Sequence, residues 1–87
     1  DLVTLDQAGE RALGAWIGCR REPENPHDTL AIRLFDGQGR KLGYVPRERN
    51  EVLARLLDAG KTLFGRLESK EWKGRWLRLE VQLFLQD

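Results

Sequence analysis

The sequence predicts a mainly β domain with one helix, arranged as a small antiparallel barrel, and three observations support this prediction. Short runs of alternating apolar and polar residues recur along the chain, as in strands that bury one face. Only the stretch after Pro46 places its apolar residues at helical spacing. Gly18, Gly43 and Gly65 fall inside strand-like runs, where the closure of a barrel requires sharp bends. An open sheet crossed by one helix is the alternative architecture.

Length and charge limit what the chain can be. Its 87 residues are enough for one hydrophobic core, so residues 1–87 are predicted to form a single domain. The net charge is +1, with 33% charged residues, which excludes a strongly basic protein that coats nucleic acid. No apolar stretch approaches the roughly 18 residues that span a bilayer, and no signal segment opens the chain, so we expect a soluble, cytoplasmic protein without membrane contact.

The sequence holds a single cysteine, Cys19, and a single histidine, His27. An internal disulfide is therefore excluded, and so is a structural zinc site, which needs about four such ligands. We expect neither a metal nor a cofactor.

The first half of the chain predicts four strands. Residues 2–5 read as a short strand, and residues 15–21 as a second one with Ile17 and Cys19 on one face. Residues 30–35 alternate in the same way, and the Asp36-Gly37-Gln38-Gly39 segment supplies residues that tolerate a tight hairpin turn. Residues 41–45 are then the partner strand, which Pro46 ends.

The second half predicts the helix and a long hairpin. Helical spacing assigns a buried face to Val52, Leu53, Leu56 and Leu57 and an outward face to Arg49, Glu51, Arg55 and Asp58. Gly60 is a plausible left-handed cap at the C-terminal end of this helix. Residues 63–72 and 75–85 pair around a turn at Lys73-Gly74, and alternation predicts one buried row, formed by Leu77, Leu79, Val81, Leu83 and Leu85.

The segment of residues 21–28 has the composition of an ordered turn. Asn25 can cap a helical turn, Pro26 has the right φ for its first position, and Asp28 places a carboxylate near the free amides. A rigid connector and a binding loop both fit these residues. His27 beside Asp28 as a general base, or Cys19 with His27 as a nucleophile pair, is discounted because neighbours in sequence rarely face each other and no oxyanion-binding residues are evident.

Two further regions carry candidate binding residues. Residues 70–78 hold four cations and one carboxylate beside Trp72 and Trp76, and rings flanked by Lys73 and Arg75 form a suitable platform for single strands. The same tryptophans also fit a cross-strand pair that stabilises the hairpin. Arg47 at the start of the helix opposes the helix dipole, so either a ligand or neighbouring carboxylates must account for it.

These residues together resemble the HIRAN domain in its bacterial form. The resemblance runs over about residues 16–67 and rests on Arg21-Glu22-Pro23-Glu24-Asn25-Pro26-His27-Asp28, Ala31-Ile32-Arg33-Leu34 and Leu42-Gly43-Tyr44-Val45-Pro46-Arg47, followed by the helix at 50–60. It implies an antiparallel barrel of the OB or SH3-like type. It also implies a module for DNA repair and replication-fork processing that binds the 3′ end of single-stranded DNA and performs no chemistry itself. Helicase, ATPase or nuclease proteins are the implied partners.

The resemblance assigns roles to particular positions. Asp28 matches an acidic residue that accepts a hydrogen bond from a 3′ hydroxyl, His27 and Tyr44 match flat side chains that contact the terminal base, and Arg47 matches a phosphate-binding cation. Arg11, Lys73 and Arg75 are weaker electrostatic candidates. Residues 8–14 lack the aromatic pair that family members carry in the first strand. The alternative function is a protein-interaction barrel that holds a peptide through the Trp72 and Trp76 hairpin.

Overall fold

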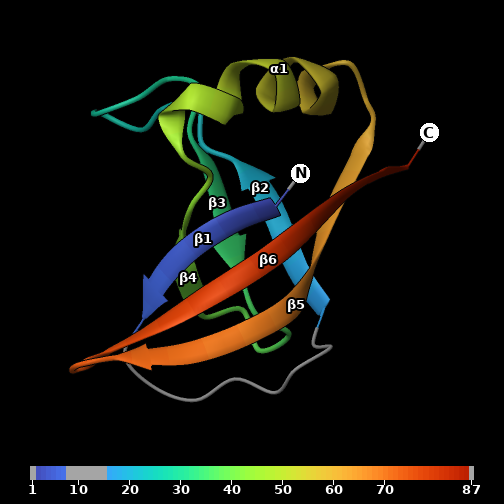
Figure 1. The fold of residues 1–87 in the computed structure, drawn as a ribbon. Coiled ribbons are helices and arrows are strands. Elements are labelled where there is room, and N and C mark those ends of the chain that lie inside the picture. The colour runs from blue at the N-terminus through green and yellow to red at the C-terminus, as the bar shows by residue number, and fades with distance from the viewer. Residues whose placement is uncertain (1, 8–15, 87) are drawn as a thin grey trace.

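Six strands and one helix make up the structure, a computed structural model that describes residues 2–7 and 16–86 (Figure 1). All strand pairs are antiparallel and form one sheet in the order β1-β6-β5-β2-β3-β4. In chain order the elements are β1 (Leu2–Gln7), β2 (Trp16–Arg21), β3 (Ile32–Phe35), β4 (Lys41–Tyr44), α1 (Arg47–Asp58), β5 (Thr62–Lys73) and β6 (Trp76–Gln86). The mainly β architecture with one helix after the Gly43-Tyr44-Val45-Pro46-Arg47 segment is confirmed.

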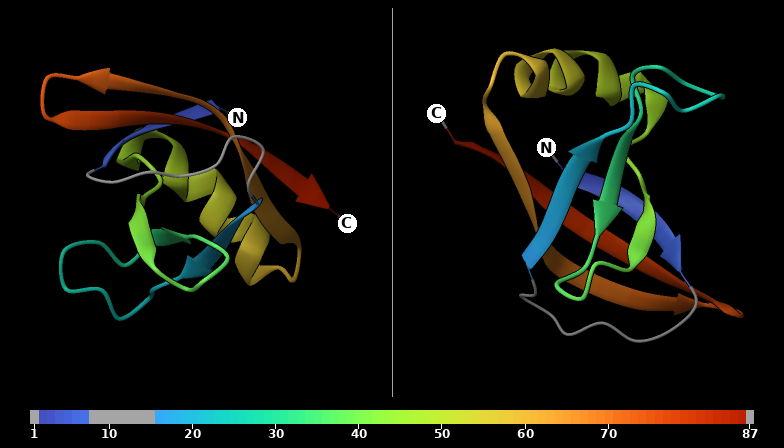
Figure 2. Two further views of the ribbon diagram at one scale, coloured as in Figure 1. Left: turned by 90° about the horizontal axis from the view of Figure 1, so that it is seen from below. Right: turned by 180° about the vertical axis from the view of Figure 1, so that it is seen from behind.

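The sheet curls strongly, but it does not close into a barrel. Its two edge strands, β1 and β4, approach each other, and α1 lies across one end of the curl (Figures 1 and 2). Within the described residues no pairing joins β1 to β4, so the expected barrel closure is wrong.

The strand glycines that suggested closure have a different role, which is to let neighbours approach closely. A Cβ on Gly65 would lie 2.7 Å from Val81 Cγ1 and 3.2 Å from Ile17 Cβ, and a Cβ on Gly18 would lie 2.3 Å from the ring of Phe35. Any residue with a Cβ would therefore force these neighbours to move.

The core fills the concave side of the sheet beneath the helix. The longest strands supply much of it: Leu63, Leu67, Leu77, Leu79, Val81 and Leu83 are all at most 5% exposed. The alternation predicted for β6 holds as far as Leu83. Leu85 is 46% exposed, because β6 continues past the residues that cover the core, so its predicted burial is wrong.

The helix buries a different stripe from the predicted one. Asn50 and Ala54 are buried, and Leu53 and Leu57 pack against the core, whereas Val52 is 66% exposed. The inward face therefore includes a polar residue at position 50, which apolar periodicity overlooks. Gly60 ends the helix region with a φ of +92°, as expected for a left-handed cap. Among the described residues no helix is long and apolar enough to cross a membrane.

Candidate nucleic-acid interface

The loop between β2 and β3 is held in place by hydrogen bonds to its own backbone. The Glu22 amide donates to the Ala31 carbonyl (3.0 Å), and the Ala31 amide donates to the Asp28 carbonyl (3.1 Å). Asn25 Oδ1 accepts from the amides of His27 (2.8 Å) and Asp28 (3.2 Å), but the capped residues form a bend and not the predicted helical turn. We call residues 22–31 the Asp28 loop. These hydrogen bonds, all made within the protein itself, define the conformation of the loop.

Asp28 is anchored by two hydrogen bonds and remains partly open to solvent. Its Oδ1 accepts from the Leu30 amide (2.9 Å), and its Oδ2 accepts from Nδ2 of the buried Asn50 (2.7 Å). The side chain keeps 21% of its exposure. The hydrogen bond from Leu30, supported by those from Asn50 and by the charge of Arg47, lowers the pKa of Asp28 below its ordinary value. At neutral pH Asp28 is therefore a carboxylate with spare acceptor capacity.

Arg47 links the start of α1 to the Asp28 loop. Its Nη2 donates to the His27 carbonyl (2.6 Å), and its Nε lies 3.7 Å from Asp28 Oδ2. These two contacts account for a cation at a helix N-terminus, where no side chain caps the helix. The Arg47 side chain is 73% exposed, so the guanidinium can also reach a ligand.

Tyr44 belongs to the same polar network. Its hydroxyl donates to Glu22 Oε1 (2.9 Å), which also accepts from Asn25 Nδ2 (3.0 Å), and Asn25 in turn holds the amides of His27 and Asp28. The hydrogen bonds from Asn25 and Tyr44 lower the pKa of Glu22, while the bond to Glu22 raises the pKa of Tyr44. Tyr44 is thereby coupled to the backbone of the Asp28 loop.

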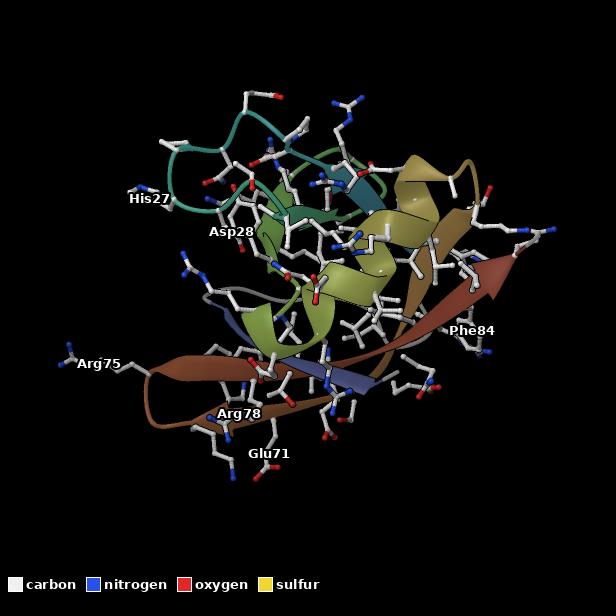
Figure 3. The ribbon with its side chains drawn as sticks, turned by 90° about the horizontal axis from the view of Figure 1, so that it is seen from above. His27, Asp28, Glu71, Arg75, Arg78 and Phe84 are labelled. Atoms are coloured by element: carbon white, nitrogen blue, oxygen red, sulfur yellow. The ribbon has the colours of Figure 1, made fainter. Side chains whose placement is uncertain are left out.

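The structure thus brings together four of the predicted site residues, namely Asp28, His27, Tyr44 and Arg47. His27 is exposed on the loop and points outward, next to Asp28 (Figure 3). An acceptor, a cation and two rings on one rigid scaffold suit a hydroxyl, a phosphate and a base. Sequence reasoning missed Glu22 and Asn50, which position these groups. Glu22 stands inside the recognised motif, but nothing in the sequence marks Asn50 as the residue that anchors Asp28.

The hairpin candidates lie elsewhere. Trp72, Lys73 and Arg75 are exposed at the tip of the β5–β6 hairpin, at the opposite end of the sheet from α1 (Figures 1 and 3). Lys73 Nζ pairs there with Glu71 Oε1 (2.9 Å). Arg11 and the side chain of Trp76 lie outside the described residues. The predicted site is therefore split between two regions.

The structure gives no support to the discounted nucleophile pair. Cys19 packs against the core, and burial raises the pKa of its thiol to about 12, so almost no thiolate exists at neutral pH. Within residues 2–7 and 16–86, no three His, Cys, Asp or Glu side chains come together as metal ligands.

Comparison with known proteins places these features in context. The sequence model of the HIRAN domain matches residues 9–86. A crystal structure of a Lactobacillus plantarum protein has a TM-score of 0.74 and 26% identity, covering 100% of this chain and 98% of that one. The crystal structure of the HIRAN domain of human HLTF has a TM-score of 0.73 and 18% identity over 99% and 76% of the two chains, a likeness of fold alone. A Fanconi-associated nuclease 1 homolog of Arabidopsis thaliana is 37% identical over 46 residues, which are 53% of this chain and 5% of that protein.

Proposed function

Because the chain belongs to the HIRAN domain family, whose members are DNA-binding modules, we propose that its Asp28 loop binds the 3′ end of single-stranded DNA. The observation that carries the proposal is the state of Asp28. The side chain is anchored through Leu30 and Asn50, is ionised at neutral pH and is 21% exposed. A carboxylate in this state accepts a hydrogen bond from a terminal hydroxyl and repels a terminal phosphate.

The neighbouring groups supply the other contacts of a strand end. Arg47, with its exposed guanidinium, neutralises the phosphate that precedes the terminal sugar. His27 and Tyr44 offer flat surfaces to the terminal base. The module itself performs no chemistry, and it directs a helicase, ATPase or nuclease partner to single-stranded ends in DNA repair or fork processing.

The test compares two forms of one strand. Fluorescence anisotropy of a labelled strand of about ten nucleotides is measured with a 3′ hydroxyl and with a 3′ phosphate. Wild type should prefer the hydroxyl, and Asp28→Ala should lose about 1.5–3 kcal/mol of that preference, the usual value of a hydrogen bond to a charged group. Glu24→Ala removes an exposed carboxylate from the same loop and should leave the preference intact. Equal binding of both ends by wild type would exclude recognition of the 3′ end.

A second candidate function uses the hairpin tip. Trp72 is 53% exposed between Glu71 and Lys73, as in a surface that holds a peptide. An apolar peptide contact through Trp72 and Trp76 would change little with added salt, whereas DNA binding weakens steeply. Binding that is insensitive to salt and lost in Trp72→Ala would favour this alternative.

A further inference from the structure

A row of aromatic rings crosses the convex side of the sheet, away from the Asp28 loop. The Trp16 and Phe64 ring centroids are 5.4 Å apart with edge-to-face geometry, and Phe64 stacks on Phe84, also at 5.4 Å. Trp16 is 62% exposed and Phe84 37%, although Ile17, Leu63 and Leu83 beside them in sequence are buried in the core. We call this surface the outer face. It also includes Phe35 of β3 and the side chains of Arg20, Arg33 and Arg66.

The outer face is hollowed beside Trp16. A groove of about 660 Å³ runs between Trp16, Phe64 and Phe35, and its lining is largely apolar. Gly18 lies within this groove, in contact with the Phe35 ring at a position where a Cβ would lie 2.3 Å from that ring. Because Gly18 has no side chain, the groove stays open and the Phe35 ring can pack against position 18.

A smaller hollow of about 250 Å³ lies beside the groove and is lined by arginines. Arg20 and Arg33 form it together with Phe35 and Gly39, which also line the groove. Arg20 of β2 stands directly opposite Arg33 of β3, and Arg66 of β5 directly opposite Trp16. Two like charges placed opposite each other destabilise a sheet. Glu22 lies 3.7 Å from Arg33, whereas Arg20 has no partner among the described residues.

Arg20 and Arg66 lack the carboxylate partner that several other described arginines have. Arg21, Arg40, Arg47 and Arg55 each pair with a carboxylate. Among the described residues, Arg20 and Arg66 have no hydrogen bond or ion pair, and the buried Nε of Arg33 has no acceptor, although its Nη1 lies 3.7 Å from Glu22. A buried donor without a partner is uncommon in a native protein.

We propose that the outer face is a second binding site, which takes an internal segment of single-stranded nucleic acid. Its bases stack in the groove against Trp16, Phe35 and Phe64, and its phosphates lie on Arg20, Arg33 and Arg66. A peptide cannot add here as a further strand, because β2, β3 and β5 are each already paired on both sides. Nucleotide bases, in contrast, can stack on rings exposed on the face of the sheet without pairing with a strand edge.

The aromatic end of this site lies away from the strand-end site, whereas Arg33 adjoins it, directly opposite Tyr44 and 3.7 Å from Glu22. Phe84 lies on the opposite side of the molecule from His27 and Asp28 (Figure 3). The carboxylate that lines the groove, Asp36, is occupied, because its oxygens accept hydrogen bonds from Gln38 and Arg40. Binding there should accept a strand whatever its 3′ group.

The experiment removes the strand-end site and then tests the outer face. In an Asp28→Ala background, anisotropy is measured with a labelled ten-thymidine strand that carries a 3′ phosphate. Trp16→Ala should weaken binding about ten-fold, as expected for one lost stacking contact, and Trp16→Phe should recover part of the loss. The double variant Arg20→Gln/Arg66→Gln should reduce the slope of log K against log salt by about 1.4, because each lost phosphate contact removes about 0.7 for a single strand.

Arg55→Gln is the matched control, since it removes one exposed cation from the outer surface of α1. Arg20 and Arg66 make no contact that folding requires among the described residues, so their double variant tests the site even if Trp16→Ala is unstable. The proposal is overturned if the blocked strand does not bind, or if the double variant binds it as Arg55→Gln does. It is also overturned if an acidic peptide ending in Phe binds the Asp28→Ala protein through Trp16 and the strand does not.

Discussion

The Asp28 loop and the outer face use polar side chains in opposite ways. Asp28, Asn25 and Glu22 of the loop, with Tyr44 of β4, form hydrogen bonds within the protein, and a ligand meets a scaffold that is already ordered. On the outer face, Arg20 and Arg66 have no partner among the described residues, and Trp16 is largely exposed. The comparison teaches that a preorganised network suits selection of one chemical group, whereas unpaired cations beside rings suit a chain of repeated phosphates and bases.

The largest effect is expected from breaking the anchor of the loop. Asn50→Leu removes the donor that holds Asp28 Oδ2 at 2.7 Å, and Asn50 itself is 3% exposed. Because the lost bond involves a charged acceptor, we expect the free energy of unfolding to fall by about 2–3 kcal/mol in urea denaturation. The preference for a 3′ hydroxyl should fall with it, while binding of the 3′-phosphorylated strand should not.

The control for this change is Val52→Ala on the same helix, where the side chain is 66% exposed and the cost should stay below about 0.5 kcal/mol. Equal loss of both kinds of binding in Asn50→Leu would mean that the two regions are not independent.

The same contrast explains what the sequence could predict. The Asp28 loop comes from one contiguous motif, so Asn25, His27 and Asp28 were recognisable together, and Tyr44 and Arg47 followed from a second motif. Sequence reasoning missed Asn50 because a polar residue on the inward face of a helix breaks the apolar periodicity that predicts burial. The same reasoning wrongly assigned Val52 to the inward face.

The outer face could not be predicted, because the sheet order assembles it from four strands. Phe35, Phe64 and Phe84 are far apart in sequence, and only the pairing of β2 with both β3 and β5 brings their strands side by side. The glycines were misread for a related reason. Gly18 and Gly65 mark close approaches between strands that are distant in sequence, which a strand pattern alone does not distinguish from barrel bends.

A smaller effect is expected from filling the groove of the outer face. Gly18→Ala places a Cβ 2.3 Å from the Phe35 ring, so the ring must move, at a cost of about 1–2 kcal/mol in unfolding free energy. Binding of the 3′-phosphorylated strand should weaken, and the preference for a 3′ hydroxyl should remain. Gly37 lines the same groove, and a Cβ added there would meet no atom within 4 Å. Gly37→Ala should therefore change neither measurement. An unchanged affinity in Gly18→Ala would show that the groove does not hold bases.

The smallest effect concerns acid, and it again separates the two regions. Asp28 has a pKa below its unfolded value, chiefly because the Leu30 amide donates to its carboxylate. Because its pKa is lowered, the Asp28 carboxylate stabilises the folded protein at pH values above its unfolded pKa, which is near 3.9. This stabilisation is lost as the pH falls through the folded-state pKa. Urea denaturation between pH 7 and pH 2 should therefore show a shallower acid loss in Asp28→Asn than in wild type.

Glu22, Asp36 and Glu71 also have lowered pKa values and contribute to the acid loss of both proteins, so only the difference between Asp28→Asn and wild type reports on the loop. Glu24→Gln, in the same loop, should not reproduce that difference. Arg20→Gln/Arg66→Gln removes no carboxylate, so it should leave the shape of the acid profile unchanged. If that double variant altered the profile as Asp28→Asn does, the two regions would be coupled through Arg33 and Glu22, whose charged groups lie 3.7 Å apart, and the separation argued above would fail.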